Sequence, residues 1–388
     1  MRKSSESLVD FGHKLVSWYE LHKRPLPWRE TSDPYRILVS ETMLQQTRVE
    51  TVIPYYHRFL RRYPDIRALA EADEADVMKL WQGLGYYSRA RNLQRAMQTV
   101  VSDHGGIIPQ DTKQVQALPG VGPYTTGAVM SIAYNQPVAA VDGNVLRVMS
   151  RYLGIADPID DKHVKADITN HVQTAVEHSV PKLFTQALME LGATVCTPRR
   201  PQCLVCPVQD ECTARSTGQV DELPRKRPKK KRKQRVIVAL WVEQNGELVV
   251  EQRGSDGLLA GMWQLPHVEL GVDEATPQAM LAAAESRLDQ LFPGNGIKVA
   301  NEVREGTDGL LQFAQIAEAK HIFTHLEWRV CVMRPVGYHD IKSGQGDLQG
   351  AEFVPIHDLQ RLVWPKVYEK ILHEILGVDV ATRDLVTR

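Results

Sequence analysis

Residues 118–129, LPGVGPYTTGAV, contain two glycines one residue apart, a proline, and then small and β-branched residues that can open a helix. Gly120 and Gly122 permit close backbone approach, and the dipole of a helix that begins near Pro123 favours a bound anion. A Walker loop would need a lysine, and a dinucleotide-binding turn would need a preceding strand, so neither applies. We predict a helix-hairpin-helix turn that contacts nucleic-acid backbone, with a plain helix–helix turn as the alternative.

Helical periodicity surrounds this turn from the N-terminus to about residue 195. Asp33 is a suitable N-cap for a helix over DPYRILVSETMLQQT that ends near Gln46. Thr47 and Glu50 have the spacing of a capping box, which predicts that the next helix starts at Thr47 and stops at Pro64. Further helices are predicted within residues 74–106, 144–154 and 163–180.

The pattern changes after residue 218. Residues 219–235, QVDELPRKRPKKKRKQR, end in eleven residues of which nine are Lys or Arg, and they predict a solvated linker. This run either adds phosphate contacts or only keeps the chain in solution, and it also resembles a nuclear-localisation run. Alternation around the Asn-Gly step of VIVALWVEQNGELVVEQR predicts a two-stranded hairpin. HIFTHLEWRVCVMRPV (321–336) is predicted as one strand and KVYEKILHEIL (366–376) as a helix, so we expect a separate α+β domain.

Composition and charge limit the classes of protein that fit. With 388 residues, 43% of them hydrophobic and 24% charged, the chain has the composition of a folded protein with two or three domains. It has no run of about 18 apolar residues and no signal-peptide pattern, so we expect an intracellular protein, cytoplasmic or nucleoid-associated, that does not enter a membrane. The formal charge of zero hides an asymmetry: residues 1–218 carry +2, residues 219–235 carry +7 and residues 236–388 carry −9.

Four of the five cysteines lie close together in the sequence. Cys196, Cys203, Cys206 and Cys212 have the spacing C-x6-C-x2-C-x5-C in a loop with three prolines. Four thiolates so close hold one compact centre, either a tetrahedral zinc ion or an iron–sulfur cluster. Structural zinc sites more often use two C-x2-C pairs and only one is present, so we predict a 4Fe-4S cluster. Cys331 stands apart in a predicted strand and is expected to be a core residue.

Three signals occur in the order known from one superfamily. LPGVGPYTTGAV, then VDGNVLRVMSR, then the cysteine pattern resemble the endonuclease III superfamily of helix-hairpin-helix DNA glycosylases. Within it, RPLPWR, SETMLQQTRV and QGLGYYSRARNL resemble the adenine DNA glycosylases of the MutY type, as do EQRGSDGLLAGMWQLP and FTHLEW near the C-terminus. The resemblance covers nearly the whole chain. It implies an all-α helix-hairpin-helix glycosylase fold with an iron–sulfur loop, followed by a C-terminal α+β Nudix-like domain.

Two carboxylates are expected to carry the chemistry. Hydrolysis of an N-glycosidic bond needs a proton for the leaving base and a negative charge beside the cationic sugar. By resemblance, Glu41 protonates adenine at N7 and later handles the attacking water; its apolar and amide-rich surroundings would raise its pKa. Asp142 would stay ionised and stabilise or trap the sugar cation. From the residues alone, Glu41 could equally be a surface glutamate and Asp142 a simple helix N-cap.

Position 124 distinguishes two classes within the superfamily. In the lyase-competent members a lysine on the helix after the turn attacks the sugar. Tyr124 stands at that place here, so the resemblance implies a glycosylase without a Schiff-base step. Tyr124 and Asn144 would orient Asp142 and the sugar.

The target base must leave the duplex before it can react. The positions that match the family's intercalating residues are Leu44, Gln46 and Tyr86. The adenine pocket would draw on Arg24, Leu26, Trp28, Arg29 and Val49, with Gln186 on the far wall. Position 186 is an amide, so no third acid is assumed there. Ordinary core packing is the alternative for Trp28 and Tyr86.

The C-terminal domain resembles the Nudix fold with one departure. Residues 261–288 lack the REUxEE core, in which U is an aliphatic residue, that supplies metal-binding carboxylates, so pyrophosphohydrolase activity is not expected. The resemblance implies instead that Phe323, Thr324 and His325 contact 8-oxoguanine opposite the adenine. The acidic balance of this part suits recognition of one base better than general backbone affinity.

These inferences combine into one hypothesis. Residues 1–218 would form the glycosylase region with the cluster loop at 196–212, residues 219–235 a basic linker, and residues 236–388 the 8-oxoguanine recognition domain. We predict a monofunctional adenine DNA glycosylase of base excision repair, a hydrolase that acts as a monomer on double-stranded DNA with adenine opposite 8-oxoguanine or guanine. The alternatives are a bifunctional glycosylase/lyase for oxidised pyrimidines, a non-catalytic mispair-binding protein and, more distantly, a Nudix nucleotide hydrolase.

Overall fold

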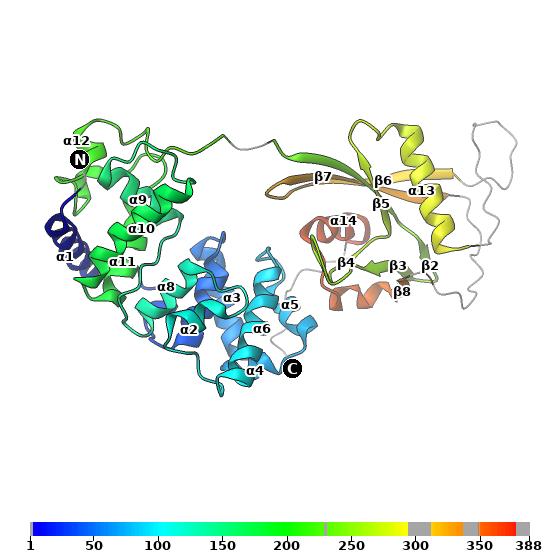
Figure 1. Ribbon diagram of the computed structural model, residues 1–388. Coiled ribbons are helices and arrows are strands. Elements are labelled where there is room, and N and C mark those ends of the chain that lie inside the picture. Colours follow the sequence, from blue (N-terminus) through cyan, green and yellow to red (C-terminus); the bar gives the residue numbers. More distant parts are fainter. Residues whose placement is uncertain (1–2, 229–230, 294–311, 337–347, 349, 378–388) are drawn as a thin grey trace, which may run out of the picture. The chain divides into compact units, whose positions relative to one another are not determined.

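The computed structural model describes residues 3–228, 231–293, 312–336, 348 and 350–377 (Figure 1). Lys229 and Lys230 of the predicted linker, and parts of the predicted C-terminal domain, lie outside the described residues. The chain divides into two compact units, one of residues 1–77 and 88–228 and the other of residues 78–87 and 229–388. None of the described helices is long and apolar enough to cross a membrane.

The first unit is helical throughout its described part, as the sequence predicted. Its α-helices are α1 (Ser5–His22), α2 (Pro34–Leu44), α3 (Val49–Arg62), α4 (Ile66–Ala70), α5 (Glu74–Trp81, which extends into the second unit), α6 (Ser88–Asp103), α7 (Thr112–Ala117), α8 (Pro123–Ile132), α9 (Gly143–Leu153), α10 (Lys162–Glu177), α11 (Pro181–Thr194) and α12 (Thr213–Ser216). Short 3₁₀ helices occupy Pro27–Arg29 (η1) and Cys203–Val205 (η2).

Local sequence signals explain several of these helix ends. The Asp33 side chain accepts a hydrogen bond from the Tyr35 amide and caps α2, as predicted. The predicted capping box at Thr47 is wrong, because α3 begins at Val49 with Arg48 as its N-cap and no side-chain cap. The Thr47 hydroxyl instead accepts a hydrogen bond from Arg89, so a tertiary contact takes the group that would have capped the helix.

The stretch predicted as helical at 74–106 contains two helices, α5 and α6. Residues 82–87 separate α5 from α6, and Gly83, Gly85 and Tyr86 there have positive φ angles. Two glycines within three residues disfavour a continuous helix, because they adopt left-handed backbone readily.

Helix α11 forms the centre of the first unit. It packs against α1, α8 and α9, while α8 also packs against α2. Close approach is possible because Gly192 on α11 faces Asn144, and a Cβ at Gly192 would lie 2.7 Å from the Asn144 Cβ. The buried core around it includes Phe11, Val148 and Phe184. Helices α2, α8, α11 and α9 are thereby joined by successive pairwise contacts.

The described residues of the second unit form two four-stranded sheets. Its strands are β1 (Lys233–Leu240), β2 (Glu243–Gln244), β3 (Glu247–Gln252), β4 (Trp263–Gln264), β5 (His267–Gly271), β6 (Gln312–Ile322), β7 (Leu326–Val336) and β8 (Ala351–Pro355). One sheet has the order β5-β1-β7-β6, with β1 parallel to β7; in the other, β3 pairs with β2, β4 and β8. Helix α13 (Pro277–Leu291) packs on β1 and β5, and α14 (Lys366–Leu376), which was predicted, packs on β6.

Two strand predictions differ from the structure. Asn245 and Gly246 form the predicted turn, both with positive φ, but only Glu243–Gln244 pairs with β3 there. The preceding residues 233–240 form β1, which pairs on both sides with β5 and β7 in the other sheet. The segment 321–336 is not one strand, because the chain turns at 323–325 and β6 pairs antiparallel with β7. Cys331 is buried in β7, as predicted.

Candidate functional site

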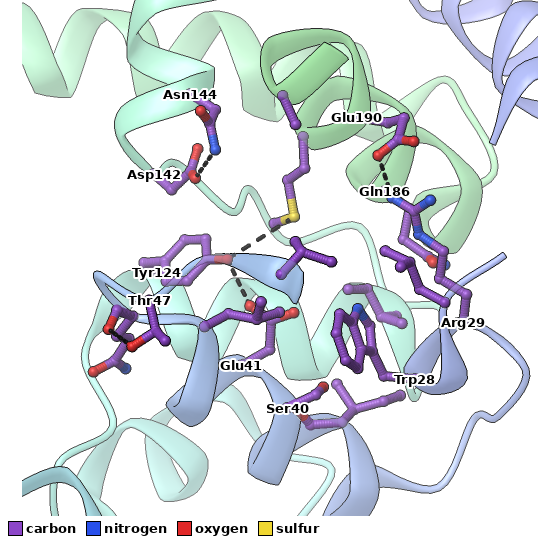
Figure 2. Close-up of a pocket in the computed structure, with 18 of the residues that line it drawn as sticks. Trp28, Arg29, Ser40, Glu41, Thr47, Tyr124, Asp142, Asn144, Gln186 and Glu190 are labelled. Carbon is purple, nitrogen blue, oxygen red and sulfur yellow. Dashed lines mark hydrogen bonds and ion pairs between the residues drawn. The ribbon is translucent and has the colours of Figure 1, made fainter. Parts of the chain in front are cut away.

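One cavity of about 520 Å³ in the first unit is lined by residues from η1, α2, α8, α9 and α11 (Figure 2). It brings together most of the predicted site residues, although they are scattered over more than 160 sequence positions. The lining includes Arg24, Leu26, Trp28, Arg29, Glu41, Leu44, Gln46, Val49, Tyr124, Asp142, Asn144 and Gln186. Gly120, Gly122, Pro123, Tyr86 and residues 323–325 are not among its lining residues.

Glu41 projects into this cavity from the buried helix α2. Its side chain accepts a hydrogen bond of 2.6 Å from the Tyr124 hydroxyl (Figure 2). Burial raises the pKa of Glu41 to about 7, and the Tyr124 hydrogen bond opposes this effect. Glu41 is 5% exposed, so it is not the surface glutamate that its sequence neighbourhood allowed. It holds a proton in the neutral range, as a general acid must.

Asp142 caps helix α9 and is also part of the cavity wall. One carboxylate oxygen accepts from the Val145 amide at 2.8 Å and the other from the Asn144 side chain at 2.8 Å. Burial raises the pKa of Asp142 above its ordinary value, and these hydrogen bonds and the charge of Arg147 offset only part of that rise. The cap and the candidate catalytic carboxylate are therefore the same group. Tyr124, which we expected to orient Asp142, instead donates to Glu41.

A chain of hydrogen bonds connects Asp142 to the cysteine loop. Asn144, which holds Asp142, accepts from the Arg147 guanidinium at 2.8 Å. The same guanidinium donates to the Cys196 carbonyl at 2.8 Å and to the Gly192 carbonyl at 2.7 Å. One arginine thus joins the start of α9, the end of α11 and the first cysteine.

The opposite wall of the cavity carries a second buried carboxylate, Glu190, on α11. It accepts from Arg24 at 2.8 Å through both oxygens and from Arg29 at 2.6 Å. Burial alone raises the pKa of Glu190, but these hydrogen bonds outweigh burial and lower it to about 2. Gln186, one turn earlier, accepts from the Tyr19 hydroxyl at 3.0 Å and donates to the Lys182 carbonyl.

Apolar side chains close the cavity between these two walls. Trp28 is 7% exposed and packs edge-on against Tyr56 at a centroid distance of 5.5 Å, yet it lines the cavity. Core packing and pocket lining therefore coexist at Trp28. Leu26 is also buried, and Val49 lines the cavity at the start of α3.

The predicted intercalating residues follow the end of α2. Leu44 ends the helix, and Gln46 is exposed with a left-handed φ of 58°. Arg89, which is buried, donates to the carbonyls of Thr42, Met43 and Gln45 at 2.6–2.9 Å and so satisfies the C-terminus of α2. The loop that holds Gln46 is thereby joined to α6.

The turn quoted at the start joins α7 to α8. Gly120 has a φ of 74°, and a Cβ there would lie 2.5 Å from the Asn92 Cβ, so both backbone and space require glycine. Gly122 is the N-cap of α8 and Pro123 is its first residue. The geometry is the helix–hairpin–helix that the sequence predicted.

The four clustered cysteines line one small cavity of about 30 Å³, together with Arg151 and Arg215. Arg151 is buried, and its guanidinium donates to the Thr197 carbonyl at 2.7 Å and lies 3.4 Å from the Cys196 sulfur. Four thiols that face one space, beside cationic side chains, suit a negatively charged cluster with thiolate ligands.

The residues predicted to contact 8-oxoguanine occupy the tip of the β6–β7 hairpin. Thr324 and His325 are exposed, whereas Phe323 packs edge-on against Trp328 at a centroid distance of 5.0 Å. Within the same unit, the Tyr86 hydroxyl lies 3.2 Å from the Thr324 hydroxyl. Tyr86 is 47% exposed, so core packing does not describe it.

The sequence did not predict a role for Glu190, Arg89 or Arg147, although all three hold parts of the site in place. Glu190 lies four positions after Gln186 on α11, one helical turn along the same face, which is the one signal that pointed to it. Arg89 and Arg147 lie inside quoted motifs. The acceptors of Arg89, and the Cys196 and Gly192 carbonyls that accept from Arg147, are more than forty positions away in sequence.

Comparison with known proteins agrees with this arrangement. Residues 39–174 match the HhH-GPD superfamily of base excision DNA repair proteins, residues 196–212 the iron–sulfur binding domain of endonuclease III, and residues 237–374 the NUDIX domain. The four cysteines therefore hold a 4Fe-4S cluster. A solved thermostable thymine-DNA glycosylase is 29% identical with a TM-score of 0.51, over 55% of this chain and 98% of that one.

Relatives extend the similarity across both units. The adenine DNA glycosylase of Mus musculus is 36% identical over 370 residues, which cover 82% of this chain and 68% of the relative. That of Schizosaccharomyces pombe is 33% identical, over 81% of each chain. With a helix-hairpin-helix unit, an iron–sulfur loop and a Nudix-like unit in the same order, the chain belongs to the adenine DNA glycosylase family.

Proposed function

We propose that the chain hydrolyses the N-glycosidic bond of adenine opposite 8-oxoguanine or guanine in double-stranded DNA. The observation that supports this most directly is that Glu41 and Asp142 line one cavity, with a proton available on Glu41 in the neutral range. Two carboxyl groups with separate roles are what cleavage of a glycosidic bond requires.

In the first step, protonated Glu41 donates its proton to N7 of the flipped adenine. The bond between C1′ and N9 then breaks, and its electron pair leaves with the base. The sugar becomes an oxocarbenium ion, which ionised Asp142 stabilises at close range. Glu41, now a carboxylate, takes a proton from the water that adds to C1′.

Tyr124 supports hydrolysis without strand cleavage. Its hydroxyl donates to Glu41, and burial raises its pKa well above the ordinary value for tyrosine, so it stays protonated. A protonated phenol is not an amine and forms no Schiff base with the sugar. The reaction therefore ends at an abasic site in an intact strand.

The remaining predicted contacts would open the duplex, hold its backbone and recognise the opposite base. Gln46, which is exposed, and Leu44 beside it would enter the duplex when the adenosine leaves the stack. Gly120, Gly122 and Pro123 would hold a phosphate at the N-terminus of α8. Thr324 and His325, at an exposed hairpin tip near Tyr86, would contact the 8-oxoguanine.

Single-turnover release of adenine tests this proposal. Two duplexes would be compared, one with adenine opposite 8-oxoguanine and one with adenine opposite thymine, and each product would be analysed before and after alkali. We expect release from the mispair only, with the strand intact until alkali is added. Release from both duplexes would reject the mispair requirement. Cleavage without alkali, with borohydride trapping of the protein on DNA, would favour the lyase alternative.

A further inference from the structure

Resting on the proposed function, we propose that Glu190 is a positioning residue that holds Arg24 and Arg29 against the adenine-binding end of the cavity and limits the effect of their charge on Glu41. Its carboxylate accepts from the Arg24 backbone amide, from Nε and Nη2 of the Arg24 guanidinium, and from Nη2 of Arg29. Arg29 in turn donates to the Arg24 carbonyl at 2.9 Å. These contacts form a closed ring of Arg24, Arg29 and Glu190 on the cavity wall, where Figure 2 labels Arg29 and Glu190.

The ring requires its carboxylate. The side chain of Glu190 is 0% exposed, so a charge there persists only because two guanidinium groups and an amide satisfy it. Without Glu190, two guanidinium groups of the same sign would face each other at the cavity with Arg29 only 11% exposed to solvent. Glu190 therefore accounts for why two cations can be adjacent there.

The wall that results has a distinct chemical preference. Guanidinium groups donate hydrogen bonds and accept none. The ring nitrogens N1, N3 and N7 of adenine are acceptors, whereas guanine presents a donor at N1. A wall of positioned donors therefore suits adenine over guanine in the flipped position, provided that the arginines keep their places.

The same ring acts on the acid across the cavity. The groups that face Glu41 are Tyr124 from α8, Asp142 from α9 and Arg29 from η1, and Arg29 lowers the pKa of Glu41. Glu190 neutralises part of that positive charge. Its loss would let Arg29 act fully, so Glu41 would lose its proton at a lower pH.

The variant Glu190→Gln keeps the size and removes the charge. We expect the alkaline limb of single-turnover adenine release to move to lower pH by roughly one unit. The plateau rate should fall about tenfold or more, because the arginines lose their fixed positions. Glu190→Asp, which retains the charge, should restore the pH midpoint even if its rate is lower.

Two further variants make the test decisive. Glu74→Gln is the matched control, since Glu74 forms an ion pair of 2.6 Å with Arg91 and does not line the cavity, and its pH midpoint should not move. Arg24→Gln leaves Glu190 less neutralised, so it should move the midpoint to higher pH. This variant tests the proposal even if Glu190→Gln fails to fold, because Arg24 is one-third exposed.

The outcomes separate this inference from the proposed function. If Glu190→Gln and Arg24→Gln release adenine with the midpoint of the unaltered protein, Glu190 is only a structural ion pair and the inference is overturned. If the unaltered protein itself releases no adenine at any pH, the proposed function fails instead. Opposite shifts in the two variants would support the inference.

Discussion

The two walls of the cavity each carry a buried glutamate, and the two glutamates have opposite properties. Glu41 on α2 has a pKa raised to about 7, whereas Glu190 on α11 has a pKa lowered to about 2. Both lie in helices of the same unit, and both side chains are removed from solvent. Burial raises the pKa of each of them.

Their partners account for the difference. Glu41 receives one hydrogen bond from a neutral phenol and faces the carboxylate of Asp142. Glu190 receives hydrogen bonds from two guanidinium groups. The comparison shows that burial by itself does not make an acid catalyst. A buried carboxyl group keeps its proton where cations compensate only weakly for the lost water, as Arg29 does at Glu41, and not where two guanidinium groups bind it directly.

The largest effect is expected from Glu41→Gln, which removes the acidic proton from the α2 side of the cavity and keeps the size of the side chain. Adenine release should fall by about two to four orders of magnitude, because general acid catalysis is lost, while duplex binding is retained. Single-turnover rates and binding of the mispaired duplex would be measured together. A rate close to that of the unaltered protein would remove Glu41 from the role of acid.

The same variant has a predicted effect on stability. A carboxyl group whose folded pKa lies above its unfolded value destabilises the fold as pH rises from 4.5 to about 7. Glu41→Gln should therefore be more stable by about 3 kcal/mol at about pH 8, with no gain below about pH 4. Urea unfolding at the two pH values would check this; an equal difference at both would contradict it.

Arg89→Leu should destabilise the C-terminal end of α2 without changing the protonation of Glu41. The carbonyls of Thr42, Met43 and Gln45 would lose a buried donor, which costs roughly 2–4 kcal/mol of unfolding free energy. Base flipping, followed by 2-aminopurine fluorescence, should slow, because the loop of Gln46 is no longer held. The pH midpoint should stay unchanged. Arg62→Leu, at an exposed ion pair, is the control.

Tyr124→Phe would increase the difference between the pKa of Glu41 and the pKa of Glu190. The lost hydrogen bond lowers the pKa of Glu41, so its removal should raise that pKa and move the alkaline limb of adenine release up by roughly one pH unit. The pH–rate profile is the measurement. A shift in the other direction would mean that Tyr124 acts mainly on another group.

The smallest effect is expected from His325→Ala, which lies outside the cavity. The ratio of rates opposite 8-oxoguanine and guanine should fall by about fivefold, since loss of one polar contact to a base costs about 1 kcal/mol, at the low end of the range for base contacts. The pH midpoint should not move, because neither wall is touched. An unchanged ratio would exclude His325 from recognition of the opposite base.

Much of the fold followed from local signals. Asp33 and Pro34 predicted the start of α2, and Gly120 and Gly122 predicted the turn before α8. The spacing of Cys196, Cys203, Cys206 and Cys212 predicted the cluster. Each of these signals involves residues that are near in sequence, so a short segment of the chain is enough to predict the helix start, the turn or the set of cysteine ligands.

The errors lie where a distant partner competes with a local one. The Thr47 hydroxyl accepts a hydrogen bond from the Arg89 guanidinium, so the predicted capping box does not form. The hairpin turn at 323–325 divides a segment that alternates like a single strand, because β6 finds its partner in β7. The alternation of apolar and polar residues shows that a segment can form a strand. Pairing with neighbouring strands then decides where each strand begins and ends.

The sequence by itself determined the order of the two units, several helix ends such as the start of α2 at Pro34, the cysteine ligands and the presence of Glu41 and Asp142. Only the tertiary structure decided which side chains form hydrogen bonds with which buried carboxyl groups. It gave Tyr124 to Glu41 across 83 positions and Glu190 to Arg24 across 166. The physical reason is that the pKa of a buried carboxyl group depends on the few groups within hydrogen-bond reach, and packing of α2, α8, η1 and α11 selects those groups.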